Sequence, residues 1–287
     1  MEAIRSRELK CKHLVYDYLE CADASGRKKI KEKYKAESGT RQYGDMSYNL
    51  VKPTSACYND CKYCYVKPMF HRFKIGVGRE ITLNPELDES KVKKAWSARA
   101  AKKAIMFPSS HDIFPSMVAE YIRVCKKMID AGHQVVCVTK PRIACINEIC
   151  YGCDAAKYKS NLMFRFTIGS ANSNTLKHWE PNAPSFEERL SSLQYAFEHG
   201  FLTSISIEPM LDDKTDVLIE TIRPYVNDKI WIGLMTQVPS ADLEDICFER
   251  NKADKIKYLM HIMNKYRYDD MIMLKSNLVK FMWGAAN

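Results

Sequence analysis

The sequence predicts an α/β protein whose sheet forms a partial (β/α)6 barrel of the TIM type. Three observations predict this class. Short apolar runs recur from residue 48 onward, amphipathic stretches with helical spacing lie between them, and 46% of the 287 residues are hydrophobic, enough for a large core. Strands that alternate with helices in this way form parallel βαβ units, and six such units close part of a barrel.

Six apolar runs are the expected strands, at residues 48–51, 104–107, 135–139, 162–168, 204–207 and 230–234. The expected helices cover residues 90–101, 116–131, 185–199 and 216–225. The third helix begins with Ser185-Phe-Glu-Glu188, a capping box in which side chains satisfy free backbone N–H groups, and it ends at Gly200. Function in such a barrel concentrates at the carboxyl ends of the strands.

Three segments are expected along the chain: a charged N-terminal extension over 1–47, the barrel over 48–235, and a C-terminal α/β cap, extension or lid over 236–287. The first segment contains the basic run Arg27-Lys-Lys-Ile-Lys-Glu-Lys-Tyr-Lys35, which fits a nucleic-acid contact as well as a solvated helix face. The stretch 269–278 fits a further strand that closes the barrel as well as a lid over the substrate.

Composition bears on the compartment and the partners. The chain has 44 basic and 35 acidic residues, hence a net charge of +9, which favours DNA or RNA as a partner and fits a merely basic surface as well. No run of 18 or more apolar residues and no apolar N-terminal centre are present, so neither a membrane span nor a signal peptide is expected. The 11 cysteines then indicate a reducing cytoplasm, with metal or thiol chemistry in place of disulfides.

The most informative stretch is Cys57-Tyr-Asn-Asp-Cys61-Lys-Tyr-Cys64, which follows the first expected strand. A [4Fe–4S] cluster takes one thiolate per iron, so three cysteines leave one iron open for a substrate or cofactor. A structural zinc site needs a fourth ligand, and the nearest candidate, His71, fits no common zinc spacing. The motif therefore favours a reactive cluster over a structural metal site.

Polar residues follow several of the other expected strands. Ser109-Ser110-His111-Asp112 comes after the second strand, where it can face a ligand or simply cap the next helix. Thr139-Lys140-Pro141 ends the third strand. Glu208 ends the fifth strand, where a carboxylate is costly to bury unless it binds a ligand hydroxyl or a partner cation.

The spacing C-x3-C-x2-C, with the aromatic Tyr63 before the last cysteine, resembles the signature of the radical S-adenosylmethionine (SAM) superfamily. Over about residues 48–235 the chain is similar to the spore photoproduct lyase-like branch of that superfamily. The similarity rests on three further segments: Ser110-His-Asp-Ile-Phe-Pro115, a partial match, Thr139-Lys140-Pro141, and Glu180-Pro-Asn-Ala-Pro184 with Arg189. The resemblance implies a partial barrel that binds a [4Fe–4S] cluster and S-adenosyl-L-methionine.

In that superfamily the amino and carboxylate groups of SAM bind the open iron. One electron from the reduced cluster then cleaves SAM to a 5′-deoxyadenosyl radical, which abstracts hydrogen from the substrate. The resemblance implies that Cys57, Cys61 and Cys64 ligate the cluster and that Tyr63 lies beside the adenine. It also implies an electron donor such as flavodoxin or ferredoxin.

The resemblance implies further contacts with SAM. Ser109 and Ser110 lie where the second strand approaches the methionine amino group. Ser170 and Arg189 are candidates for the SAM carboxylate, which a guanidinium can bind through two hydrogen bonds. Glu208 is a candidate for the ribose or a nearby polar contact.

The expected function is therefore a radical SAM enzyme, a lyase or modifying enzyme that acts on a nucleic-acid base or nucleotide in repair or modification. No cysteine like the hydrogen donor of the DNA-repairing members is identified, because Cys125 and Cys137 fall inside a helix and a strand. Two alternatives stay open. One is a radical SAM enzyme acting on a peptide or small metabolite, and the other is a non-catalytic, metal-containing nucleic-acid-binding protein.

A second group of cysteines follows the third expected strand. Cys145, Cys150 and Cys153, with Cys137 nearby, fit an auxiliary iron–sulfur cluster or a zinc ion. They also fit ordinary reduced cysteines, which are common small buried residues. Cys145 and Cys150 are poorly spaced for one face of a helix, so both interpretations stay open.

Overall fold

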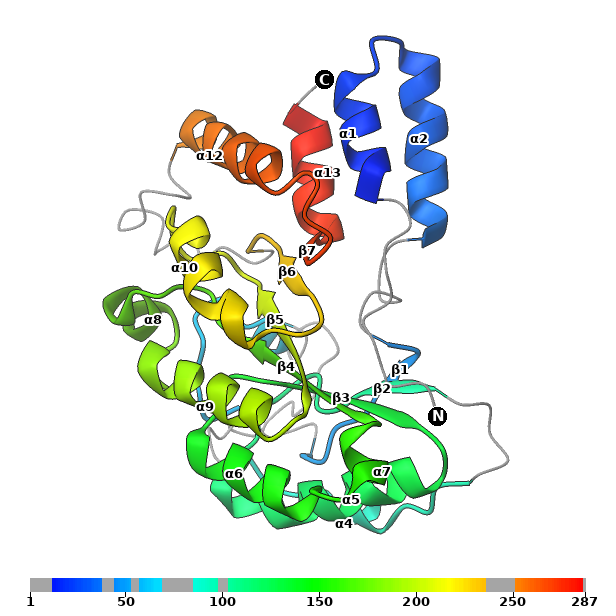
Figure 1. Cartoon of the computed structure of the whole chain (residues 1–287), viewed down its shortest axis with the longest axis vertical. Helices are drawn as coiled ribbons and strands as arrows, with labels where there is room; N and C mark the ends of the chain where they lie inside the picture. Colours follow the sequence, from blue (N-terminus) through cyan, green and yellow to red (C-terminus); the bar gives the residue numbers. More distant parts are fainter. Residues whose placement is uncertain are drawn as a thin grey trace.

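The computed structural model describes residues 12–37, 44–52, 57–68, 85–97, 103–235 and 251–285. In this part of the chain seven strands form one parallel sheet, and their spatial order follows their order in the sequence (Figure 1). The strands are β1 (Met46–Ser47), β2 (Ala104–Met106), β3 (Gln134–Thr139), β4 (Leu162–Thr167), β5 (Leu202–Ile207), β6 (Ile230–Ile232) and β7 (Ile272–Leu274).

The sheet curls around a cavity. Residues in or just beyond each of the seven strands line it, from Ser47 in β1 to Lys275 after β7, and a flat sheet could not bring them together. β1 and β7 are the two edges, so the barrel is partial, as predicted. Among the described residues the strand count is seven and not six, because Ile272–Leu274 pairs in parallel with β6. The stretch 269–278 thus supplies a further strand.

Side chains of the central strands alternate between a helix-covered face and the cavity. In β4, Phe164 and Phe166 are fully buried in the main apolar core, whereas Thr167 lines the cavity. Burying one such aromatic side chain contributes about 1.5–3 kcal/mol. The covering helices are α5 (Val118–Asp130), α6 (Ile143–Gly152) and α9 (Phe186–Glu198), seen below the sheet in Figure 1. The apolar core therefore lies on the outer face of the sheet and leaves the inner face available to a ligand.

The other helical elements connect strands or lie at the ends of the described chain. They are α1 (Lys12–Glu20), α2 (Ala24–Glu37), α4 (Glu89–Lys93), η2 (Pro115–Met117), α7 (Ala156–Lys159), α8 (Ser173–Trp179), α10 (Thr215–Ile222), η3 (Arg223–Tyr225), α12 (Lys252–Lys265) and α13 (Ser276–Ala285). Of these, α1, α2, α12 and α13 gather beyond one side of the sheet, at the top of Figure 1. None of the described helices combines the length and the hydropathy needed to span a membrane.

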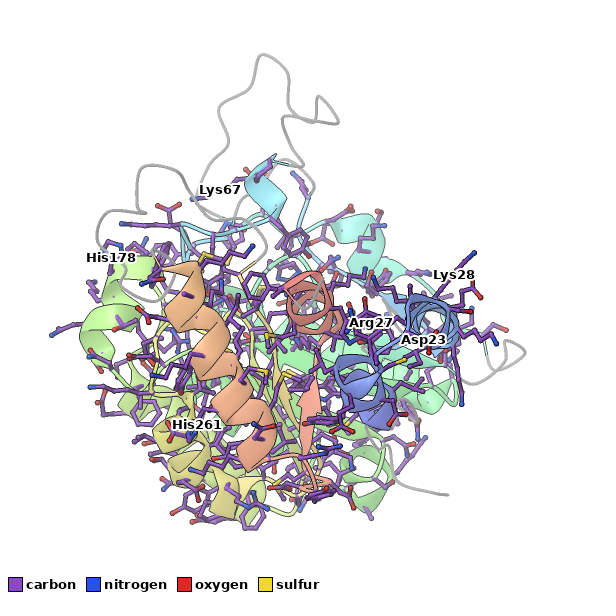
Figure 2. The ribbon with its side chains drawn as sticks, turned by 90° about the horizontal axis from the view of Figure 1, so that it is seen from above. Asp23, Arg27, Lys28, Lys67, His178 and His261 are labelled. Carbon is purple, nitrogen blue, oxygen red and sulfur yellow. The ribbon has the colours of Figure 1, made fainter. Side chains whose placement is uncertain are left out.

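Helices from opposite ends of the chain pack together in this group. The indole of Trp283 in α13 contacts Tyr18 of α1 and Tyr34 of α2, with ring centroids 4.5 and 4.9 Å apart. The basic run expected in the N-terminal segment lies on α2, where Arg27 packs over the Tyr18 ring and Lys28 is exposed (Figure 2). The N-terminal helices are therefore anchored to α13, while α2 still presents part of its positive charge to solvent.

Five expected strands agree with β2 to β6 to within two residues at each end. The first, expected at 48–51, is misplaced, because β1 covers Met46–Ser47. The N–H of Tyr48 still donates to Met106 of β2 at 2.9 Å, but the N–H of Leu50 donates to His111 Nε2 at 3.2 Å. The expected helix at 90–101 is too long: α4 ends at Lys93, and Lys94 adopts an extended backbone with ψ 132°. The other three expected helices are confirmed as η2 with α5, as α9, and as α10 with η3.

The N-cap half of the predicted capping box at the start of α9 is confirmed, since Ser185 Oγ accepts a hydrogen bond from the Glu188 N–H at 3.3 Å, whereas Glu188 Oε1 accepts from the Ile143 N–H at 3.1 Å. We expect Ser185→Ala to lower the free energy of unfolding by about 1 kcal/mol, because one N–H of the first turn loses its acceptor. Denaturant unfolding measures this change. Ser191→Ala, at an exposed site on the same helix, is the control. Equal stability of the two variants would contradict a capping role.

Candidate cofactor site

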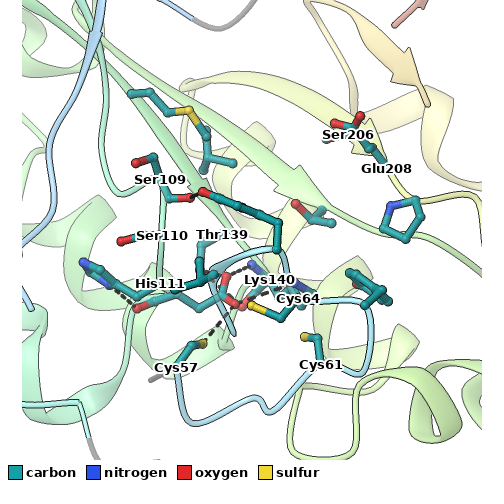
Figure 3. Close-up of a pocket in the computed structure, with 18 of the residues that line it drawn as sticks. Cys57, Cys61, Cys64, Ser109, Ser110, His111, Thr139, Lys140, Ser206 and Glu208 are labelled. Carbon is teal, nitrogen blue, oxygen red and sulfur yellow. Dashed lines mark hydrogen bonds and ion pairs between the residues drawn. The ribbon is translucent and has the colours of Figure 1, made fainter. Parts of the chain in front are cut away.

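A cavity of about 710 Å³ lies inside the curl of the sheet, at the carboxyl ends of the strands. Cys57, Cys61 and Cys64 line one part of it, and Ser206 and Glu208 lie across from them (Figure 3). Cavities of this size accommodate cofactors and other small molecules. The carboxyl end is also the functional face of barrels built from parallel strands. The predicted location of the cysteine motif, after the first strand and on this face, is confirmed.

Two consecutive turns shape the loop that carries the three cysteines. The N–H of Asp60 donates to the Cys57 carbonyl at 3.3 Å, and the N–H of Cys64 donates to the Cys61 carbonyl at 3.1 Å. Asp60 has a φ of 50°, a left-handed conformation that aspartate tolerates better than most residues. Cys61 is buried, and burial raises the pKa of its thiol to about 12. Burial and the nearby Asp112 also raise the pKa of Cys57.

The donor set fits an iron–sulfur cluster better than a single metal ion. Within the described ranges, no three Cys, His, Asp or Glu side chains converge closely enough to bind one ion. A cluster presents its irons at separate corners, so its thiolates need only face a common space. The three cysteines do so. The alternative zinc ligand His71 lies outside the described residues.

Asp112 connects the cysteine loop to the end of β3. Its Oδ1 accepts hydrogen bonds from Thr139 Oγ1 at 2.9 Å and from the backbone N–H of Lys140. Its Oδ2 accepts from Asn59 Nδ2 at 2.8 Å and lies 3.7 Å from Cys57 Sγ. Burial alone would raise the pKa of Asp112, but the ammonium of Lys140 and these hydrogen bonds hold it below its usual value. Asp112 is therefore a buried, charged residue directly behind the cysteines.

Lys140 is the cation that faces this group. Its Nζ lies 3.7 Å from Asp112 Oδ2 and 5.8 Å from the centre of the Tyr63 ring, and the residue lines the cavity. Burial opposes the charge, but Cys61, Tyr63 and Asp112 raise the pKa of Lys140 well above its usual value. The sequence placed Lys140 in a motif without a role. The structure makes it a fixed positive charge beside the thiols.

His111 is held by the backbone on both sides of its ring. Nε2 accepts from the Leu50 N–H at 3.2 Å, so Nδ1 carries the proton and donates to the Asp112 carbonyl at 2.9 Å. Both ring nitrogens are thus satisfied in the neutral tautomer. His111 therefore has a structural role, in which its ring joins two backbone segments. The residue also lines the cavity.

Burial lowers the pKa of His111, so the folded protein binds this proton less readily than the unfolded chain. Its contribution to stability is therefore lost as pH falls below about 6.5. We expect the free energy of unfolding to decrease from pH 7.5 to pH 5.5, and His111→Gln to reduce that decrease. Denaturant unfolding at both pH values checks this, and an unchanged difference between them in the variant would contradict it.

Ser109 and Ser110 line the cavity at the end of β2. Their backbone N–H groups both donate to Asn49 Oδ1, at 2.8 and 2.9 Å, and Asn49 Nδ2 donates back to Ser109 Oγ at 3.0 Å. The hydroxyl of Tyr65 donates to the Ser109 carbonyl at 2.7 Å. These contacts fix the backbone of the segment against the loop after β1. Asn49 was not predicted, because its role depends on a contact across 60 residues.

Glu208 lies at the end of β5 and lines the cavity. The ammonium of Lys275 pairs with its Oε2, and Asn277 Nδ2 donates to its Oε1 at 2.9 Å. Lys275 Nζ also donates to Ser206 Oγ at 2.7 Å. Lys275 is therefore the partner cation expected beside this carboxylate, which is partly buried with 24% of its side chain exposed. Lys275 was not predicted, although it directly follows the apolar run of β7, a strand-end position like that of Glu208.

Tyr63 lines the cavity, and its hydroxyl donates to Glu180 Oε1. Arg189 and Ser170 do not belong to the cavity lining. The Arg189 guanidinium pairs with Glu180 and donates to the carbonyls of Pro184 and Thr167, at 2.9 and 3.2 Å. The hydroxyl of Ser170 donates to Asp212. Protein partners thus occupy both side chains that were expected to bind the SAM carboxylate.

The second group of cysteines lies in the core between β3, α5 and α6. Cys137, Cys145, Cys150 and Cys153 are each at most 1% exposed, as is Cys125 of α5. Burial raises the pKa of the Cys137 thiol to about 12. Complete burial of these five side chains fits reduced cysteines packed in the core, which is one of the two interpretations of this group.

No protein-family model matches the sequence, and no curated protein matches it either. Among solved structures, the chain is similar to Streptococcus suis SuiB, with TM-scores of 0.48 for SuiB and 0.47 for SuiB bound to S-adenosylmethionine. In both cases the sequences are 9% identical, and the match covers 87% of this chain and 53% or 54% of SuiB. The chain thus spans about half the length of SuiB. At this level of similarity, function has to be inferred from the residues of the site.

Proposed function

We propose that the protein is a radical SAM enzyme that binds a [4Fe–4S] cluster through Cys57, Cys61 and Cys64 and cleaves S-adenosyl-L-methionine. One observation carries the proposal: three thiols from a single loop face a cavity at the carboxyl ends of a curled parallel sheet. Three thiolates can hold three irons and leave the fourth to bind a ligand. When bound, the cluster would supply the electron that cleaves SAM to the 5′-deoxyadenosyl radical.

Four residues of the cavity are proposed to contact SAM. Tyr63 would lie against the adenine, and Ser109 and Ser110 would lie near the methionine amino group. Glu208 would accept hydrogen bonds from the ribose hydroxyls, with Lys275 fixing the orientation of the carboxylate. The placement of Glu208 across the cavity from the cysteines supports this assignment, because it leaves room for a nucleoside between them (Figure 3).

The SAM carboxylate needs a cation. Arg189 and Ser170 were expected to bind it, but a carboxylate would have to displace Glu180 from the Arg189 guanidinium and Asp212 from the Ser170 hydroxyl. Lys140 lines the cavity beside the cysteines and carries its charge there. We therefore propose that Lys140 binds the carboxylate, and that Arg189 and Ser170, which lie outside the cavity lining, do not contact SAM directly.

For the substrate, we propose a nucleic-acid base or nucleotide, modified or cleaved in the cavity. The net charge of +9 and the exposed basic residues of α2 support a polyanionic partner. A mobility-shift assay with DNA and RNA at several salt concentrations tests it, because binding through phosphate contacts weakens steeply as salt rises. Binding to neither nucleic acid would favour a peptide or a small metabolite.

The enzymatic proposal has a direct test. The protein is reconstituted with iron and sulfide without oxygen, reduced with dithionite, and incubated with SAM. We expect about four irons per chain, brown absorbance, and formation of 5′-deoxyadenosine. Flavodoxin or ferredoxin is expected to replace dithionite as the electron donor. An intact cluster that yields neither 5′-deoxyadenosine nor another SAM fragment would refute the proposal.

A further inference from the structure

We infer that the turn at residues 179–182, fixed by the buried Glu180–Arg189 ion pair, is a clamp that positions the cysteine loop for cluster binding. The inference rests on the proposed function, since it assigns the clamp to the same cysteines. The sequence marked Glu180-Pro-Asn-Ala-Pro184 and Arg189 as a motif near the cofactor. Their contacts point to the protein loop and not to the cavity.

The turn holds the cysteine loop first through the backbone. The N–H of Lys62 donates to the Trp179 carbonyl at 2.9 Å, and the N–H of Asn182 donates to the Asn59 carbonyl at 3.4 Å. Asn182 Nδ2 adds a hydrogen bond to the Tyr58 carbonyl at 3.1 Å. Both turns of the loop are therefore attached to one short segment at the carboxyl end of α8.

A buried side-chain relay adds to this attachment. Glu180 accepts from the Tyr63 hydroxyl with one oxygen and pairs with Arg189 through the other. The side chains of Glu180 and Arg189 are both 0% exposed, and the guanidinium is also bound by two backbone carbonyls. Burial opposes the charge of Arg189, but Glu180 raises its pKa. Tyr63, which lies between the second and third cysteines, is thereby fixed to the start of α9.

Arg142 joins the turn to the loop from a third direction. Its Nη2 donates to Asn59 Oδ1 at 2.8 Å and to the Asn182 carbonyl at 2.7 Å. Asn59 is itself fully buried and donates to Asp112. The loop is therefore held between Asp112 on one side and the 179–182 turn on the other.

The contacts of the clamp indicate a positioning role, because they are made to the residues between the cysteines and not to the cysteines themselves. The clamp binds the residue pairs Tyr58–Asn59 and Lys62–Tyr63, which lie between successive cysteines of the loop. It makes none of these hydrogen bonds to Cys57, Cys61 or Cys64, whose side chains face the cavity. Residues that orient the groups carrying metal ligands, without ligating metal themselves, commonly change metal affinity 10- to 100-fold when replaced.

The test uses the full chain reconstituted without oxygen and measures the rate at which iron passes to an added chelator. Two variants weaken the clamp: Glu180→Gln, whose single amide oxygen cannot accept from both partners, and Arg142→Met, which keeps the packing but loses two hydrogen bonds. Arg223→Met is the matched control, because it breaks the ion pair with Asp269, and neither of these residues lines the cavity. Circular dichroism and the unfolding midpoint are recorded for each protein before reconstitution.

We expect both clamp variants to lose iron roughly 10- to 100-fold faster than the wild type, and the control to match the wild type even where its unfolding midpoint is lower. If Glu180→Gln does not fold, Arg142→Met decides the outcome alone. Folded clamp variants that release iron at the wild-type rate would overturn the inference and leave the proposed function standing. A wild-type protein that binds no iron would overturn both.

Discussion

Replacing any one of Cys57, Cys61 and Cys64 by alanine is expected to abolish iron binding and the formation of 5′-deoxyadenosine. Two remaining thiolates leave two irons of the cluster without protein ligands, and the cluster then dissociates or fails to assemble. We expect iron to fall from about four per chain to close to none, measured after anaerobic reconstitution and desalting. The loss of activity should be complete and the same for the three positions, because each thiolate holds a different iron of one cluster.

Two further cysteines provide controls for this experiment. Cys21 lies between α1 and α2, outside the cavity lining, and Cys150 is buried in the second cysteine group. Cys21→Ala and Cys150→Ala are expected to keep the full iron content. Cys150→Ala should lower stability by roughly 1 kcal/mol, because it leaves a small cavity. Loss of part of the iron in Cys150→Ala would instead point to an auxiliary cluster, and full iron in all three motif variants would refute the proposed ligands.

The central strands were predictable because apolar side chains recur at every second position, on the face that packs against the helices. Phe164 and Phe166 in β4, and Ile205 and Ile207 in β5, follow this pattern and are fully buried. The edge strands were harder. β1 has two residues, and its neighbour Leu50 is apolar but bonds to a histidine ring. A pattern of apolar residues indicates burial and not the backbone partner, so it placed the first strand at 48–51, after the two residues that form β1.

In the candidate site, too, residues in a local pattern were predictable, whereas residues that depend on long-range contacts were not. The cysteine loop was predictable because its spacing is local, and each of its three cysteines lines the cavity. Lys275 and Asn277 were not, because they reach Glu208 from 67 and 69 residues away through a strand that pairs only in the folded sheet. Arg189 shows the opposite failure. Its motif predicted a ligand contact, but the turn after α8 places Glu180 against its guanidinium first.

Lys140→Met is expected to destabilise the protein by roughly 3–5 kcal/mol at neutral pH, because it leaves the Asp112 carboxylate buried without its cation. The side chains of Lys140 and Asp112 are 12% and 11% exposed, so water replaces little of the lost interaction. Methionine keeps most of the apolar stem of lysine, so the change tests the charge more than the packing. Denaturant unfolding before reconstitution measures the effect apart from any cluster.

The pH dependence distinguishes lost charge from lost packing. In the wild type Lys140 helps to hold the pKa of Asp112 below its usual value, so the stability this group provides is present above about pH 4 and is lost as pH falls through the lower, folded value. Without the cation, burial raises the pKa of Asp112. At acidic pH the Asp112 carboxyl group of the variant is then protonated, and the cost of burying an unpaired carboxylate disappears. The stability difference should therefore shrink between pH 7 and pH 4. Lys157→Met, which breaks the exposed pair with Asp130, is the control and should cost at most about 1 kcal/mol. A difference for Lys140→Met that stays constant with pH would mean that Lys140 acts through packing and not as the counter-charge to Asp112.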